Sequence, residues 1–213
     1  MFIYIFGSVC RGEIDCHSDI DLLLITDKSS DELDSKKYSI YSPDRIKQLW
    51  NIGNPFAWHL FLESKLVYSY DNSNFIKNLG CPNQYNNVLT DCLKFYAIFH
   101  EAVNTIKRTN KSEIFELSNI FLAIRNFAIC YSLSSQSIPN FSRDSALKLT
   151  KNKLTIELES YRVLERSRIL CTRGEGCIPN KNEIELAISS IESIDIWMKK
   201  ILNLLEDSNN VRI

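Results

Sequence analysis

The chain has 213 residues, of which 45% are hydrophobic and 24% are charged, and its formal net charge is −1. This is the composition of a globular protein, and the length suffices for one large or two small domains with a hydrophobic core. A near-neutral balance provides no broad basic surface, which argues against bulk binding of nucleic acid.

The cysteine content and the start of the chain predict a compartment. The seven cysteines include no Cys-x-x-Cys pair, and an odd number without framework spacing is typical of a reducing environment. The chain begins with a strand-like apolar run rather than a charged and then apolar leader, and no apolar stretch approaches membrane-spanning length. We therefore expect a cytoplasmic protein without membrane contact.

The first 26 residues predict a strand, a tight turn, a short helix, a loop and a second strand. Residues 2–6, FIYIF, are a compact apolar run of the kind that forms a buried strand. Gly7 allows a sharp turn and close approach of the backbone to a ligand, and Ser8 begins a short helix with free N–H groups. This turn is therefore predicted to hold phosphate.

Two aspartates follow this turn. Ten residues separate Ser8 from Asp19, and Asp21 leads into the apolar run 22–25. Alternate residues of a strand face the same way, so Asp19 and Asp21 are predicted to project together. Paired carboxylates repel each other unless a cation lies between them, and hard oxygen ligands suit Mg²⁺ or Mn²⁺. The aspartates are therefore predicted to hold a metal beside phosphates, as phosphoryl transfer requires.

The segment GSVCRGEIDCHSDIDLLL, residues 7–24, resembles the Gly-Ser, ten residues, Asp-x-Asp signature of the DNA polymerase β-like nucleotidyltransferases in their minimal form. The segment NPFAWHLFLESKLVYSYD, residues 54–71, is similar to the second half of small nucleotidyltransferase domains of the antitoxin and kanamycin nucleotidyltransferase-like kinds. The resemblance implies catalytic and metal-binding roles for Asp19 and Asp21, and nucleotide binding by Gly7, Ser8 and Arg11.

The same resemblance implies a third carboxylate on the next strand, where it completes the metal site and acts as general base. That strand is predicted over 38–41, and in the run KYSIYS either Lys37 or Ser39 stands at the expected place. Asp34, Asp27 or Glu63 would have to reach the site from other elements. If none of them does, the protein is a slow enzyme or a nucleotide-binding relic.

After Gly80-Cys81-Pro82-Asn83 the pattern becomes helical. Apolar residues recur at three- and four-residue spacing. They predict five helices, over 88–107, 113–134, 142–151, 155–171 and 181–206. The sequence thus predicts an α+β protein, with a nucleotidyltransferase domain that has a small mixed sheet at 1–80 and a helical bundle domain at 83–213.

The helical half is also loosely similar to HEPN bundles, which often partner minimal nucleotidyltransferases. HEPN ribonucleases carry a histidine separated from an arginine by four to six intervening residues, and from Arg125 the corresponding positions are Cys130, Tyr131 and Ser132. None is histidine, so we expect no ribonuclease activity. Arg125 is expected to have a structural role, paired with Glu116 or Glu101.

Together these features predict a Mg²⁺-dependent nucleotidyltransferase that transfers a nucleoside monophosphate, AMP from ATP in the favoured case, to a hydroxyl. The acceptor is predicted to be a partner protein such as a toxin or, less favoured, a small molecule. The alternative is a degenerate, antitoxin-like or regulatory module that binds a nucleotide or partner. A homo-oligomeric regulator is a third possibility.

Overall fold

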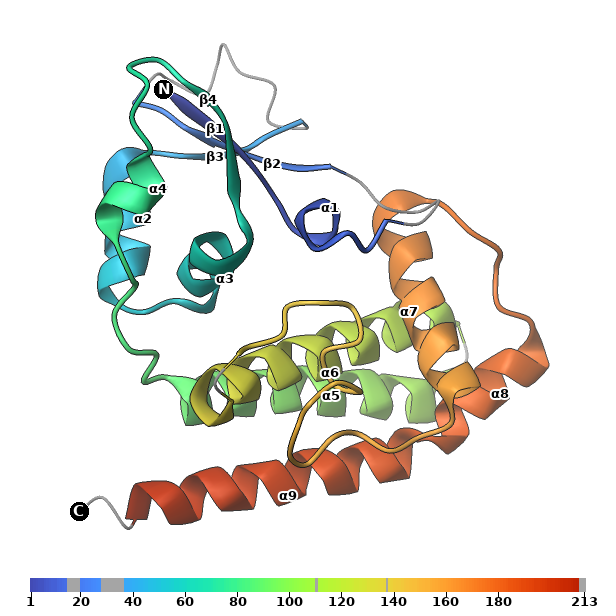
Figure 1. Cartoon of the computed structure of the whole chain (residues 1–213). Helices are drawn as coiled ribbons and strands as arrows, with labels where there is room; N and C mark the ends of the chain where they lie inside the picture. The colour runs from blue at the N-terminus through green and yellow to red at the C-terminus, as the bar shows by residue number, and fades with distance from the viewer. Residues whose placement is uncertain (15–19, 28–36, 110, 137, 211–213) are drawn as a thin grey trace. The chain divides into compact units, whose positions relative to one another are not determined.

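The computed structural model describes residues 1–14, 20–27, 37–109, 111–136 and 138–210. These residues form two compact units, Met1–Asn86 and Asn87–Ile213 (Figure 1). Each unit has its own secondary structure and is described by itself.

A four-stranded mixed sheet organises the first unit. In spatial order it consists of β3 (Ser39–Tyr41), β2 (Asp21–Ile25), β1 (Phe2–Phe6) and β4 (Lys65–Ser69) (Figure 1). Strand β1 is antiparallel to both β2 and β4, whereas β2 and β3 are parallel. The helices of this unit are α1 (Ser8–Arg11), α2 (Pro43–Asn51), α3 (Pro55–Glu63) and α4 (Phe75–Leu79). The predicted fold class, a small mixed sheet followed by a helical part, is confirmed.

Alternation along β1 builds the core of this unit. Phe2, Tyr4 and Phe6 are buried, whereas the residues between them are partly exposed. The buried side chains join Leu23 and Ile25 of β2 in a cluster with residues of α2 and α3. The sheet therefore has one face packed on helices, and burial of its alternate apolar residues fixes the strand register.

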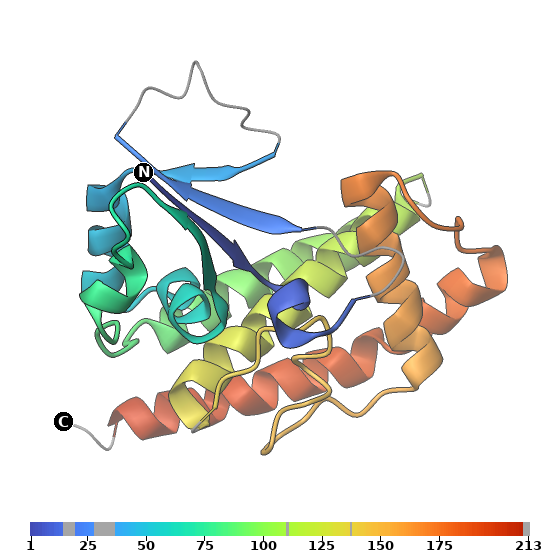
Figure 2. The same ribbon diagram turned by 45° about the horizontal axis from the view of Figure 1, so that its top comes forward.

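The second unit is built of helices: α5 (Val88–Arg108), α6 (Glu113–Ser135), α7 (Leu158–Arg173), α8 (Lys181–Ser189) and α9 (Ile191–Asn210). Figures 1 and 2 show α5 and α6 side by side. Contrary to the sequence prediction, α6 is long and apolar enough to cross a membrane, and 67% of its most apolar window is buried inside the protein. Such burial is that of a core helix, which is apolar on most sides because other helices surround it.

Two predicted helices are wrong. The stretch predicted as a helix at 142–151 forms turns, closed by hydrogen bonds such as that from the N–H of Leu147 to the carbonyl of Asp144 at 2.9 Å. The helix predicted at 181–206 is instead two helices that meet at Ser190, whose hydroxyl donates to the carbonyl of Ala187 at 2.7 Å. A serine side chain that bonds locally to the backbone competes with helix continuation.

Arg125 of α6 holds the turn segment in place. Its guanidinium donates to the carbonyl oxygens of Phe141, at 3.0 Å, and Ser142, at 3.4 Å. The hydroxyl of Ser145 donates in turn to the Arg125 carbonyl at 3.0 Å. Glu116, one of the predicted partners of Arg125, accepts a hydrogen bond from Asn119. These contacts give Arg125 the structural role expected for it, because its guanidinium provides hydrogen-bond donors for carbonyl groups of the turn segment.

Arg125→Ala is expected to lower the free energy of unfolding by about 1–3 kcal/mol, because it leaves half-buried carbonyl groups without a charged donor. Urea unfolding measures this loss. Arg108→Ala, at an arginine whose side chain is 69% exposed, is the matched control and should change stability little. RNA cleavage without metal that disappears in Arg125→Ala would contradict the purely structural role expected for Arg125.

Candidate active site

The turn after β1 brings the predicted phosphate-binding residues to the edge of the sheet. Gly7 has a φ of +79°, which favours glycine, and it precedes the four-residue helix α1 that begins at Ser8. The N–H of Cys10 closes the turn on the Gly7 carbonyl at 3.1 Å. On the neighbouring strand, Asp21 pairs with Phe6, the residue immediately before Gly7. Strand pairing therefore brings Asp21 next to the turn.

The carboxylate of Asp21 lies directly against the backbone of Gly7. A Cβ atom built on Gly7 would be 2.3 Å from Oδ2 of Asp21, much closer than such atoms approach in real structures. Only glycine at this position leaves room for the carboxylate, which is partly exposed. A carboxylate oxygen beside a glycine backbone fits the hard-ligand preference of Mg²⁺, and a glycine without a side chain allows the close approach of a phosphate.

The other predicted metal ligand, Asp19, lies outside the described residues and remains a prediction from the sequence. Within the described ranges, no group of three or more histidine, cysteine, aspartate or glutamate side chains is placed to hold a metal. Asp21 is therefore the predicted ligand whose surroundings the structure defines.

Arg11, predicted to bind nucleotide, forms two ion pairs at the end of α1. Its Nε lies 2.8 Å from Oε2 of Glu13, and its Nη1 lies 2.5 Å from Oε2 of Glu63. Burial alone would lower the pKa of Arg11, but the hydrogen bonds and charges of the two carboxylates outweigh burial and raise it. The guanidinium is therefore held in its charged form by acidic partners of this chain.

Residues 1–73 match the family model described as polymerase beta, nucleotidyltransferase. The match covers β1, the Gly7 turn, α1 and β2, the elements that place Asp21 against Gly7. This region is a nucleotidyltransferase domain of the polymerase β superfamily. No curated protein matches the chain. The predicted superfamily is confirmed, whereas the likeness of the helical unit to HEPN bundles lies outside the match and stays a prediction.

The third carboxylate expected of such a nucleotidyltransferase domain is absent from β3, whose residues are SIY. Asp27 is six residues beyond Asp21 along β2 and its extension, a separation of about 20 Å in an extended chain. Glu63 accepts a hydrogen bond from Arg11 and contacts His59. Asp34 lies outside the part of the chain that the structure describes. Asp27 is thus excluded as the completing ligand, and the Glu63 carboxylate is paired with Arg11 and His59.

Sequence reasoning assigned no role to the pair that Glu63 makes with His59. The Nε2 atom of His59 lies 2.9 Å from Oε2 of Glu63, and both side chains are largely buried. Their spacing of four residues on α3 was the available signal, because such residues are neighbours on one helix face. Their connection to Arg11 of the nucleotidyltransferase signature carried no signal in the sequence.

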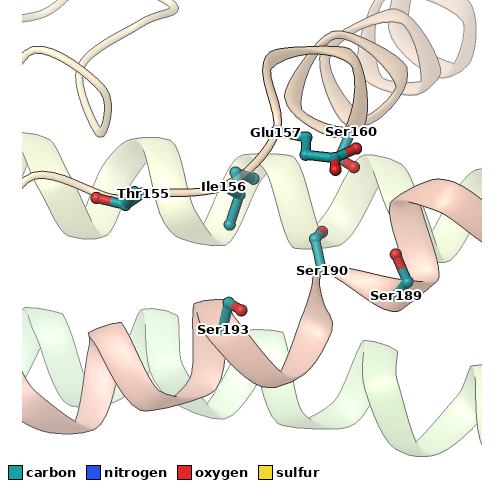
Figure 3. A pocket seen from close by; sticks show the side chains of 7 residues that line it. All are labelled: Thr155, Ile156, Glu157, Ser160, Ser189, Ser190 and Ser193. Carbon is teal, nitrogen blue, oxygen red and sulfur yellow. The ribbon is translucent and has the colours of Figure 1, made fainter.

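Two hollows in the protein lie away from this turn. One, of about 490 Å³ in the helical unit, is lined by Ser160, Ser189, Ser190 and Glu157 among others (Figure 3). The hydroxyls of the three serines donate to backbone carbonyls. The other hollow, of about 710 Å³ in the first unit, lies at the Ile25 end of β2, opposite Asp21. Neither of these two hollows is lined by Gly7 or Asp21, and the candidate active site of the nucleotidyltransferase domain is the turn beside Asp21.

Proposed function

We propose that this protein transfers a nucleoside monophosphate, AMP from ATP in the favoured case, to a hydroxyl of a partner protein or of a small molecule. The contact between Oδ2 of Asp21 and the backbone of Gly7 carries the proposal, because it joins a metal-binding carboxylate to a phosphate-binding turn. The family match over residues 1–73 supports a nucleotidyltransferase type of activity.

In the proposed reaction, the backbone of Gly7 and the hydroxyl of Ser8 bind the distal phosphates of the nucleotide. Asp21, with Asp19 as its predicted partner, would hold a divalent metal, which when bound supplies positive charge against the phosphate oxygens. The acceptor oxygen forms a bond to the α-phosphorus, the bond from that phosphorus to the β-phosphate oxygen breaks, and pyrophosphate leaves. The hydroxyl proton passes to a base. These residues act by positioning and by neutralising charge.

The experiment is transfer of label from nucleotides by the full chain. The protein is incubated with each of the four α-³²P-labelled nucleoside triphosphates, Mg²⁺ or Mn²⁺, and lysate as a source of acceptors. We expect label on a protein or small-molecule acceptor and release of pyrophosphate, and no transfer from γ-labelled ATP. Absence of transfer from every nucleotide would contradict the proposed enzyme activity.

A nucleotide-binding or partner-binding module is the second candidate, favoured by the position of Lys37. Strand β3 runs parallel to β2, with Ser39 beside Leu23, and Lys37 and Asp21 each stand two residues earlier. The exposed Lys37 ammonium lies 5.6 Å from the centre of the Tyr38 ring. A cation at the place expected for an acid disfavours metal binding and leaves the site without a general base.

Lys37→Asp is therefore expected to raise transfer activity or metal affinity above that of the wild type, by up to about 10²-fold if the new carboxylate acts as general base. Initial rates of label transfer and titration with Mn²⁺ measure the change. Lys151→Asp, at an exposed lysine in a turn of the helical unit, controls for the change in net charge. Metal-dependent nucleotide binding with no transfer in either wild type or Lys37→Asp would favour the binding module.

A further inference from the structure

A cluster of three side chains links α1 to α3. It consists of Arg11, His59 and Glu63, whose side chains are 18%, 15% and 13% exposed. Oε2 of Glu63 contacts both Nη1 of Arg11, at 2.5 Å, and Nε2 of His59, at 2.9 Å. We name this cluster the α1–α3 clamp. It joins residues that are 52 positions apart in the chain.

Helix α1 needs such a contact to stay in place. It has four residues and buries none of them, and isolated helices of this length are unstable because nucleation is unfavourable. The thiol of Cys10 donates to the carbonyl of Ile5 at 3.3 Å, a weak hydrogen bond. The ion pair of Arg11 with Glu63 is the stronger contact, because a hydrogen bond between charged, largely buried groups is stronger than one between neutral groups.

The clamp contacts the chain on both sides of Gly7. Arg11 lies four residues after it, and the ring of Phe6, immediately before it, packs edge-on against the His59 ring at 5.5 Å between centroids. Phe6 is also the residue that pairs with Asp21. Side chains of α3 therefore hold the strand end and the helix that bracket the Gly7–Ser8 turn.

We propose that Glu63 is a positioning residue for the phosphate-binding turn. It holds Arg11, and through Arg11 it keeps α1 and the Gly7–Ser8 turn in place beside Asp21. Arg11 accordingly acts on nucleotide binding through α1, and its guanidinium serves Glu63 rather than a phosphate. This inference rests on the proposed function for its effect on the nucleotide, whereas the effect of Glu63 on α1 does not depend on it.

The test compares nucleotide affinity in Glu63→Ala, Arg11→Ala and the double variant, with the Mg²⁺ complex of α,β-methylene-ATP as probe. Each single change is expected to raise Kd by about 10- to 100-fold, as loss of residues that orient ligand-binding groups does elsewhere. Both residues act through one contact, so the Kd of the double variant should be no higher than that of whichever single variant binds the nucleotide more weakly. Transfer assays should show the loss mainly in KM for the nucleotide.

Glu63→Gln and Lys47→Ala complete the set. Glu63→Gln keeps an oxygen that accepts a hydrogen bond from Arg11, so a partial recovery of affinity relative to Glu63→Ala is expected. Lys47→Ala breaks an ion pair with Asp44 on α2 in which both side chains are more than half exposed, and it should leave Kd unchanged. If Glu63→Ala leaves binding intact or tightens it while Arg11→Ala weakens it, Arg11 contacts phosphate directly and the inference fails.

Amide hydrogen exchange separates the clamp from the proposed function. The N–H groups of Cys10, Gly12 and Glu13 are hydrogen-bonded within and just after α1. They should exchange faster in both Glu63→Ala and Glu63→Gln than in the wild type, with the larger effect in Glu63→Ala and none in Lys47→Ala. Unchanged exchange in Glu63→Ala overturns the inference, whereas a wild-type protein that binds no nucleotide overturns the proposed function alone.

Discussion

Replacing Gly7 with alanine is expected to destabilise the nucleotidyltransferase domain and to abolish nucleotide transfer. The new methyl group would lie 2.3 Å from Oδ2 of Asp21, and the φ of +79° is unfavourable for alanine. Backbone strain of this kind costs about 1–3 kcal/mol, and relief of the clash requires that the Asp21 carboxylate or the turn moves. Urea unfolding and transfer of label from α-labelled ATP measure the two effects.

Gly12→Ala is the matched control for this change. Gly12 has a similar φ of +73°, but a Cβ atom there would meet nothing within 4 Å. Its replacement should therefore cost about 1–2 kcal/mol of stability from backbone strain alone and leave the Asp21 contact unchanged. Equal losses of activity in Gly7→Ala and Gly12→Ala would show that backbone strain, and not the clash with Asp21, causes the loss.

Asp21→Asn should reduce nucleotide transfer by about 10²–10³-fold, because Asp21 is proposed to bind the metal and loss of such a carboxylate removes several kcal/mol of charge stabilisation. Binding of nucleotide should lose its dependence on Mg²⁺ or Mn²⁺ for the same reason. The amide has nearly the shape of the carboxylate, so the melting temperature should not fall. Isothermal titration with Mg²⁺ and ATP, together with the transfer assay, measures these changes.

Asp27→Asn controls for the loss of one negative charge near the same strand. Asp27 is exposed and lies beyond the opposite end of β2, so its replacement should alter neither transfer nor metal dependence. An Asp21→Asn variant that binds the Mg²⁺ complex of ATP as tightly as the wild type would refute the metal site at Asp21.

Local patterns in the sequence determined the elements that build the N-terminal site. The apolar run before Gly7 predicts β1, and the run after Asp21 predicts β2, because burial of such runs outweighs other local preferences. At the start of α2, Pro43 occupies the first turn and the Ser42 hydroxyl accepts from the N–H of Arg45 at 3.2 Å, a local cap that these residue types favour. The fold class follows from the change of pattern after residue 80.

Contacts between distant residues decided the rest, because side-chain pairing across the fold leaves no periodic signal in the chain. The 142–151 stretch has helical spacing, yet Arg125 binds carbonyls at its start and it forms turns. Arg11 reads as a phosphate ligand from its motif, whereas its pairing with Glu63 depends on how α3 packs near α1. The contact of Asp21 with Gly7 likewise requires the register that pairs Asp21 with Phe6. The sequence by itself therefore determined the candidate residues for the chemistry, and only the tertiary structure decided which of the described ones touch.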